Sequence, residues 1–179
     1  MKRVSFLLLW LATGIAWAGG FVADKFQGSP FEYDFDADTK PWREVQAQLP
    51  AAPGADALRE FAVGGGSGHR YFLDTASLSA AEDRVVRYTL VIRTAGGAEN
   101  VTYEGMRCDN GERKVYAFGR PGGEWSRNKH ARWEPIDARG ATSYHKELFF
   151  HYFCTVDGPG DLKLIRRAIE RGGIRRGGD

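Results

Sequence analysis

Three runs of β-forming residues follow one another in the middle of the chain and are separated by short turns that contain glycine. The runs cover residues 85–95, 100–108 and 113–119, and the turns contain Gly-Gly at 96–97 and Asn-Gly at 110–111. Apolar and polar side chains alternate along the first run, a period that is typical of a half-buried strand. Asn-Gly between two such runs is a strong hairpin signal. The sequence therefore predicts three consecutive antiparallel strands.

Helices are expected on both sides of this meander. Residues 41–49 begin with proline and repeat Trp42, Val45 and Leu49 at helical spacing. Residues 143–154 place large apolar side chains at helical intervals. The stretch 161–173 has an apolar stripe, arginines in its last turns and glycine just beyond them.

The resulting fold class is α+β, with an antiparallel β-meander sheet packed against two or three helices. Residues 70–74 and 131–136 are expected to add strands to the meander. The length of the chain fits one domain with a core of its own. A content of 42% hydrophobic residues is typical of a globular protein.

The N-terminus resembles a secretory signal peptide. Lys2 and Arg3 are followed by an apolar run from 4 to 15, and small residues at Ala16 and Ala18 form a cleavage motif. The run is shorter than the roughly 20 residues that a membrane-spanning helix requires. No cysteine follows that could accept a lipid anchor. We expect cleavage after Ala18 and a periplasmic protein that is not a lipoprotein.

Removal of the signal peptide changes the charge of the chain. The precursor has 25 Lys and Arg against 23 Asp and Glu, and the signal contains Lys2, Arg3 and no acid, so the mature chain has 23 of each. Nucleic-acid binding without sequence specificity depends on a surplus of basic residues. Nucleic acid is therefore not an expected partner.

Composition divides the chain into four segments. We expect a signal peptide at 1–18, a flexible segment at 19–33, one domain at 34–171 and a disordered basic tail at 172–179. The acidic start and the basic end could pair with each other or be solvated separately. An alternative is a weak contact of the tail with an anionic surface, which salt would weaken.

The two cysteines, Cys108 and Cys154, are expected to form a disulfide bond. An even number of cysteines in an exported protein is typical of disulfide bonding. The bond would join the end of the second meander strand to the end of the helix at 143–154. It would close a loop of about 46 residues, which the chain-entropy model values at about 4 kcal/mol.

The spacing of the two cysteines disfavours other roles for them. A redox-active pair is usually spaced Cys-x-x-Cys, unlike Cys108 and Cys154. A zinc site needs four ligands, and His151 with Cys154 provides only half of such a motif. A Cys/His nucleophile pair has no local signature. We therefore expect no metal and no cofactor.

Two further motifs lack essential residues. The stretch 34–38 resembles the start of a calcium loop, but Thr39 and Val45 stand where an EF-hand needs glycine and glutamate. The glycine-rich stretch 63–68 lacks the lysine and hydroxyl residue of a phosphate loop. No catalytic residue is assigned from the sequence.

A resemblance extends over most of the mature chain. Residues 70–108, the stretches "KVYAFG" and "GEWSRNKHARWEPI", and "YFC" at 152–154 resemble the cryptic neisserial protein-like (CNP-like) family of small exported proteins from Gram-negative proteobacteria. The likeness runs from about Asp34 to the C-terminus and is most specific between Phe72 and Cys108. It implies a periplasmic location and supplies no activity, cofactor or catalytic residue.

Two classes of function follow. The first is a non-enzymatic envelope protein that binds another envelope protein or a glycan, with Tyr116, Trp125 and Trp133 as candidate partner-binding aromatics. The alternative is that these rings fill the core. The second class is an envelope hydrolase or other envelope enzyme that uses Glu104, His130 or His145 as acid or base.

Overall fold

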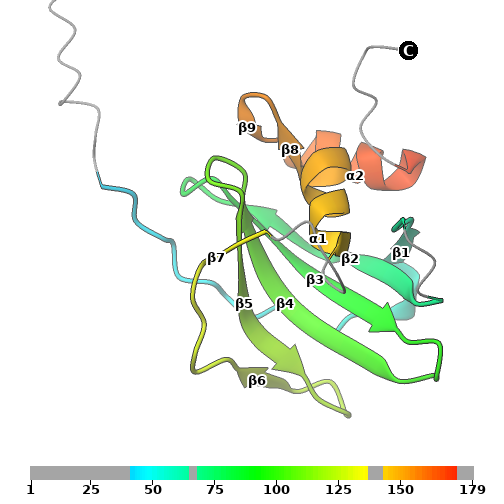
Figure 1. The fold of residues 1–179 in the computed structure, drawn as a ribbon. Coiled ribbons are helices and arrows are strands. Elements are labelled where there is room, and N and C mark those ends of the chain that lie inside the picture. Colours follow the sequence, from blue (N-terminus) through cyan, green and yellow to red (C-terminus); the bar gives the residue numbers. More distant parts are fainter. Residues whose placement is uncertain (1–40, 65–67, 137–142, 173–179) are drawn as a thin grey trace, which may run out of the picture. The chain divides into compact units, whose positions relative to one another are not determined.

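The computed structural model describes residues 41–64, 68–136 and 143–172. Its main element is an antiparallel sheet in which β1 to β6 lie in chain order and β7 pairs with β5 (Figure 1). The strands are β1 Leu58–Phe61, β2 Arg70–Ala80, β3 Val85–Arg93, β4 Glu99–Arg107, β5 Glu112–Gly119, β6 Trp125–Arg127 and β7 Glu134–Pro135.

The predicted meander is confirmed. β3, β4 and β5 pair in sequence, and a bulge between Tyr103 and Glu104 shifts the register of β4 against β5. The strand expected at 70–74 extends to Ala80. Only two residues of the stretch 131–136 form a strand, β7. The short strands β1 and β6 were not predicted.

Two helical segments lie over one face of the sheet (Figure 1). The first contains α1, Ser143–Glu147, and a π-helix, Leu148–Phe153; the second is α2, Leu162–Arg171. Between them β8, Cys154–Thr155, pairs with β9, Gly158–Pro159. The predicted helices at 143–154 and 161–173 are thus confirmed, with the first ending one residue early.

The ends of α2 follow from its sequence. The Asp161 carboxylate accepts a hydrogen bond from the backbone N–H of Leu164, which caps the N-terminus. Gly172 ends the helix in the left-handed conformation at φ 76°, which glycine adopts without steric cost.

The main core lies between these helices and the sheet. Side chains at alternate positions of β3, such as Val86, Tyr88 and Leu90, pack against Leu148 and Phe153. The rings of Tyr88 and Phe153 lie 4.8 Å apart. The face of β3 that was predicted to be apolar is therefore the face covered by helices.

The opposite face of the sheet is also covered, unlike the half-buried sheet that the alternation predicted. On β3, Arg87 is 4% exposed and Thr89 is fully buried. The cover is the segment 42–53, here called the strap. The helix predicted at 41–49 is wrong, because these residues form neither helix nor strand.

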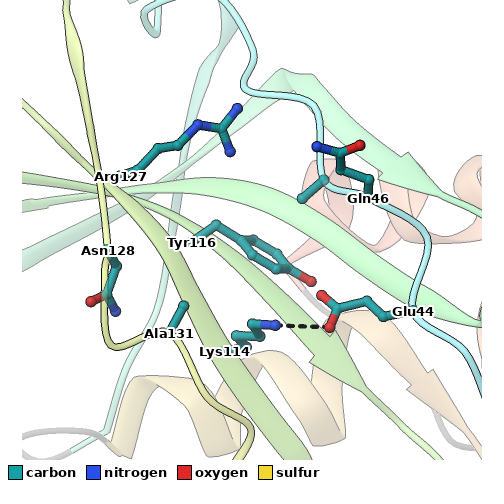
Figure 2. A pocket seen from close by; sticks show the side chains of 8 residues that line it. Glu44, Gln46, Lys114, Tyr116, Arg127, Asn128 and Ala131 are labelled. Atoms are coloured by element: carbon teal, nitrogen blue, oxygen red, sulfur yellow. Dashed lines mark hydrogen bonds and ion pairs between the residues drawn. The ribbon is translucent and has the colours of Figure 1, made fainter.

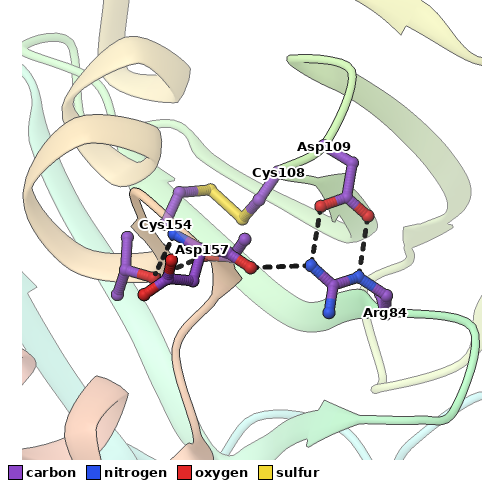
Figure 3. Close-up of a disulfide and its surroundings, with 7 residues drawn as sticks. Arg84, Cys108, Asp109, Cys154 and Asp157 are labelled. Carbon is purple, nitrogen blue, oxygen red and sulfur yellow. Dashed lines mark hydrogen bonds and ion pairs between the residues drawn. A yellow bond between two sulfur atoms is a disulfide. The ribbon is translucent and has the colours of Figure 1, made fainter. Parts of the chain in front are cut away.

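The disulfide between Cys108 and Cys154 is present, with α-carbons 5.5 Å apart (Figure 3). It joins the residue after β4 to the residue after the π-helix. Beside it, the Arg84 guanidinium donates to both carboxylate oxygens of Asp109 and to the carbonyl of Asp157. Gly158 has a φ of 111°, a backbone conformation that residues with a side chain rarely adopt, so this position favours glycine.

Several expected segments lie outside the described residues: the signal peptide at 1–18, the segment 19–33, the start of the domain at 34–40 and the tail beyond Gly172. Within the described part of the chain, no helix has the length and apolar character needed to cross a bilayer.

Candidate functional site

The strap is held on the sheet by side-chain hydrogen bonds. The indole N–H of Trp42 donates to the backbone carbonyl of Asp83 over 2.8 Å. The Asp83 carboxylate accepts from the N–H of Val45 over 2.8 Å, and the Arg87 guanidinium donates to the Val45 carbonyl over 2.7 Å. One buried acid–base pair thus binds both backbone groups of a single strap residue.

Asp83 and Arg87 form an ion pair that is almost closed to water. Their side chains are 0% and 5% exposed. Burial alone would raise the pKa of Asp83, but hydrogen bonds from Arg87 and the backbone of Val45 outweigh it and lower that pKa. Burial alone would lower the pKa of Arg87, and Asp83 outweighs this effect and raises it. Both groups are therefore ionised at neutral pH.

An open cavity of about 330 Å³ lies beside the strap (Figure 2). The strap forms one wall, and β5, β6 and the segment after β6 form the other. The lining residues are Glu44, Gln46, Ala47, Lys114, Tyr116, Arg127, Asn128 and Ala131.

The Glu44 carboxylate organises one wall of the cavity. It accepts hydrogen bonds from the Lys114 ammonium over 2.8 Å and from the Trp133 indole over 3.1 Å. Burial alone would raise the pKa of Glu44, but these donors, with the Tyr116 hydroxyl that faces it, lower that pKa. Glu44 therefore compensates the charge of Lys114 across the physiological range of pH.

Tyr116 lies across the floor of the cavity. It is 8% exposed, and its hydroxyl is directed at Glu44 (Figure 2) without a hydrogen bond of ordinary geometry to any described residue. Burial raises its pKa well above the ordinary value, so the hydroxyl stays protonated and able to donate. Gly105 makes room for it, because a β-carbon there would lie 2.5 Å from the Tyr116 oxygen.

Arg127 supplies a second positive charge. Its side chain extends from β6 over the cavity toward Gln46 of the strap (Figure 2). Among the described residues, neither the Arg127 guanidinium nor the Gln46 amide forms a hydrogen bond or ion pair. Asn128, by contrast, donates from its side-chain amide to the Val115 carbonyl and accepts from the N–H of His130.

The three aromatic residues predicted to bind a partner lie on this face of the sheet. The Trp125 indole donates to the Pro50 carbonyl over 2.8 Å, and Trp133 donates to Glu44. Tyr116 packs edge-on against Trp133. All three contact or support the strap, and partner binding through them stays a prediction.

Two of the three candidate acid or base residues, Glu104 and His145, lie side by side. His145 Nε2 lies 2.7 Å from the Glu104 carboxylate, which also accepts hydrogen bonds from Tyr88 and Thr102. Burial alone would raise the pKa of Glu104, and the charge of His145 together with these hydrogen bonds lowers it. The two side chains are each 2% exposed, so α1 separates them from solvent.

His130 lies apart from this pair, in an exposed turn after β6. The structure does not bring it to Glu104 and His145. Within the described ranges, no three His, Cys, Asp or Glu side chains are placed to hold a metal ion.

The sequence profile of the CNP1-like family matches residues 37–169, about three quarters of the chain. The chain belongs to the CNP1-like family. It is 28% identical over 196 residues to cryptic neisserial protein 1 of Neisseria gonorrhoeae (strain ATCC 700825 / FA 1090), covering 97% of this chain and 95% of that protein. No solved structure matches the chain.

Most residues that line the cavity of this CNP1-like chain were not predicted. Glu44 lies in a segment whose apolar spacing indicates a helix, and Gln46 follows it there. Lys114 and Arg127 lie in or beside β-forming runs, and no local motif marks them. Only Tyr116 was singled out, because of its aromatic side chain.

Proposed function

We propose that the protein is an exported, non-enzymatic binding protein of the bacterial envelope. The observation that carries this proposal is the open cavity beside the strap. Its lining combines charged, amide, aromatic and small apolar side chains, a mixture typical of sites that bind small molecules or parts of larger ones. Several of these side chains are held in place by hydrogen bonds before any ligand arrives.

Export is supported by two independent features. The first 18 residues have the basic, apolar and small-residue order of a secretory signal. The disulfide between Cys108 and Cys154 suits an oxidising compartment such as the periplasm.

A binding role is favoured over catalysis because of where the acid–base pair lies. A general acid or base must come within hydrogen-bond reach of its substrate. Glu104 and His145 are enclosed between the sheet and α1, and their hydrogen bonds are made to each other and to core residues. Their arrangement therefore fits a structural role in fixing α1 on the sheet.

Cell fractionation tests the location. The protein is expected in the periplasmic fraction, with a mass that corresponds to cleavage after Ala18. Retention of residues 1–18 in a cytoplasmic fraction would contradict export.

Cross-linking in the intact periplasm, followed by mass spectrometry, tests the binding role and separates a protein partner from a glycan. A photo-reactive amino acid at position 46, on the rim of the cavity, is expected to give a specific adduct. The same group at Val156, which is 96% exposed and on the β8–β9 turn, is the control. Equal labelling from both positions would contradict binding at the cavity.

A further inference from the structure

The charge of the cavity is unbalanced by one positive group. Lys114 is compensated by Glu44, and the two atoms of this pair lie 2.8 Å apart. Arg127 has no such partner among the described residues, although its guanidinium extends over the same space. The uncompensated charge is therefore that of a single arginine at the mouth.

The shape of an arginine side chain favours one type of ligand group. A guanidinium presents parallel N–H donors that match the two oxygens of a carboxylate, or of a phosphate, in a bidentate pair. Across the cavity, the Gln46 amide can donate to the same group, since it extends from the strap toward Arg127 (Figure 2). A dianionic phosphate is disfavoured, because Glu44 places a negative charge on the same lining.

The rest of the cavity lining determines which chemical groups the ligand can carry besides its anionic group. Ala47, Ala131 and the ring of Tyr116 give an apolar wall, and the Tyr116 hydroxyl is directed at Glu44 rather than into the open space. A volume of about 330 Å³ is at the small end of ligand sites, which range over roughly 300–1,000 Å³.

We propose that this cavity binds a small organic molecule that carries one carboxylate group, with Arg127 as the anchor of the carboxylate and Gln46 as a further hydrogen-bond donor. The inference deepens the proposed binding function, because it uses the same cavity. It makes no use of the location of the protein or of a macromolecular partner.

Two-dimensional NMR of the purified protein tests the proposal with benzoate and N-acetylglycine as probes. Their neutral amides and phenyl phosphate are the comparison compounds. Both carboxylates are expected to shift the amide signals of Gln46 and Arg127 and the indole signal of Trp133, which donates to Glu44. Their affinity should exceed that of the amides, and benzoate should bind more tightly than phenyl phosphate.

Variants of exposed residues make the test specific. Arg127→Gln should weaken both carboxylates about tenfold or more, because a hydrogen-bonded charge is lost. Arg127→Lys should retain only part of the affinity, since it keeps the charge without the bidentate geometry. Lys129→Gln removes the same charge from an exposed residue outside the lining and should leave affinity unchanged.

Three results would overturn the inference: no shift with either carboxylate, equal shifts with the amides, or equal loss in Arg127→Gln and Lys129→Gln. Tighter binding of phenyl phosphate would overturn the choice of a carboxylate. Periplasmic cross-linking could still capture a partner through the rim in each case, so failure here is distinct from failure of the binding function.

Discussion

Asp83 and Arg87 place two opposite charges where water hardly reaches. Such a pair is costly to desolvate, and its value depends on additional hydrogen bonds that satisfy the remaining donors and acceptors. The backbone of Val45 supplies two of them, one to each partner. The pair therefore does more than neutralise charge, since it also fixes the position of the strap.

Replacement of Asp83 by Asn is expected to lower the free energy of unfolding by about 3–5 kcal/mol, because Arg87 then stays buried without a counter-charge. Urea denaturation measures the loss. The control is Glu99→Gln, which breaks the exposed ion pair with Arg93 and should cost less than about 1 kcal/mol. Similar losses in both variants would refute the role of the buried pair.

Glu104 gives the protein a pH dependence whose sign follows from its lowered pKa. The unfolded chain has the ordinary glutamate pKa of about 4.3, so it binds the proton before the folded protein does as pH falls. The stabilisation by ionised Glu104 is therefore complete above that value and is lost as pH falls through the folded pKa.

The free energy of unfolding, followed from pH 6 down to pH 2, is expected to show this effect. The difference between the wild-type protein and Glu104→Gln should be largest at pH 5–6 and should shrink below about pH 4. Other carboxyls titrate in both proteins, and the difference isolates Glu104. A difference that is constant with pH would show that Glu104 acts through packing alone.

At the scale of elements, the pairing of β4 with β5 brings the Tyr116 side chain close against Gly105. Gly105→Ala is expected to displace this ring and to destabilise the protein by about 1–3 kcal/mol. Thermal denaturation measures the loss, and the Trp133 indole signal should move with the ring. Gly54→Ala is the matched control, because a β-carbon there meets nothing within 4 Å; equal effects would contradict the close contact.

The elements differ in how far their sequences predict them. β3, β4 and β5 have alternating side chains and an Asn-Gly turn, so their pairing is encoded within about 35 residues. The strap has the apolar spacing of a helix at Trp42, Val45 and Leu49, yet its hydrogen bonds reach residues 38 to 89 positions away. The helix propensity of a segment contains no information on contacts so distant in sequence. In the strap, tertiary hydrogen bonds override that propensity.

The same reason explains how much of the candidate site was predictable. Glu104 and His145 could be named as titratable residues, but their burial depends on how α1 docks on the sheet. Arg127 and Gln46 line the same cavity only because the strap lies beside β6. By contrast, the pairing of Cys108 with Cys154 was predictable, because the chain has no other cysteines.

For the whole molecule, the disulfide links the sheet to the helical layer across 46 residues. Its loss is expected to lower the free energy of unfolding by about 4 kcal/mol, according to the chain-entropy model. Guanidinium denaturation of the oxidised protein and of the double variant Cys108→Ala/Cys154→Ala measures the difference.

Dithiothreitol should destabilise the wild-type protein by a similar amount and leave the double variant unchanged. A wild-type protein with the same stability before and after reduction would contradict this expectation.

The strap also dictates an order of events when the chain is delivered N-terminus first. Residues 42–53 emerge before every group that binds them, and the last of these groups, on Trp133, comes about 80 residues later. The backbone groups of the strap therefore stay hydrated until the strands that bind them have formed. Assembly of the cavity is thus a late event. A chain that ends before residue 125 would lack Arg127, and it would also lack Trp125 and Trp133, which donate hydrogen bonds to the strap.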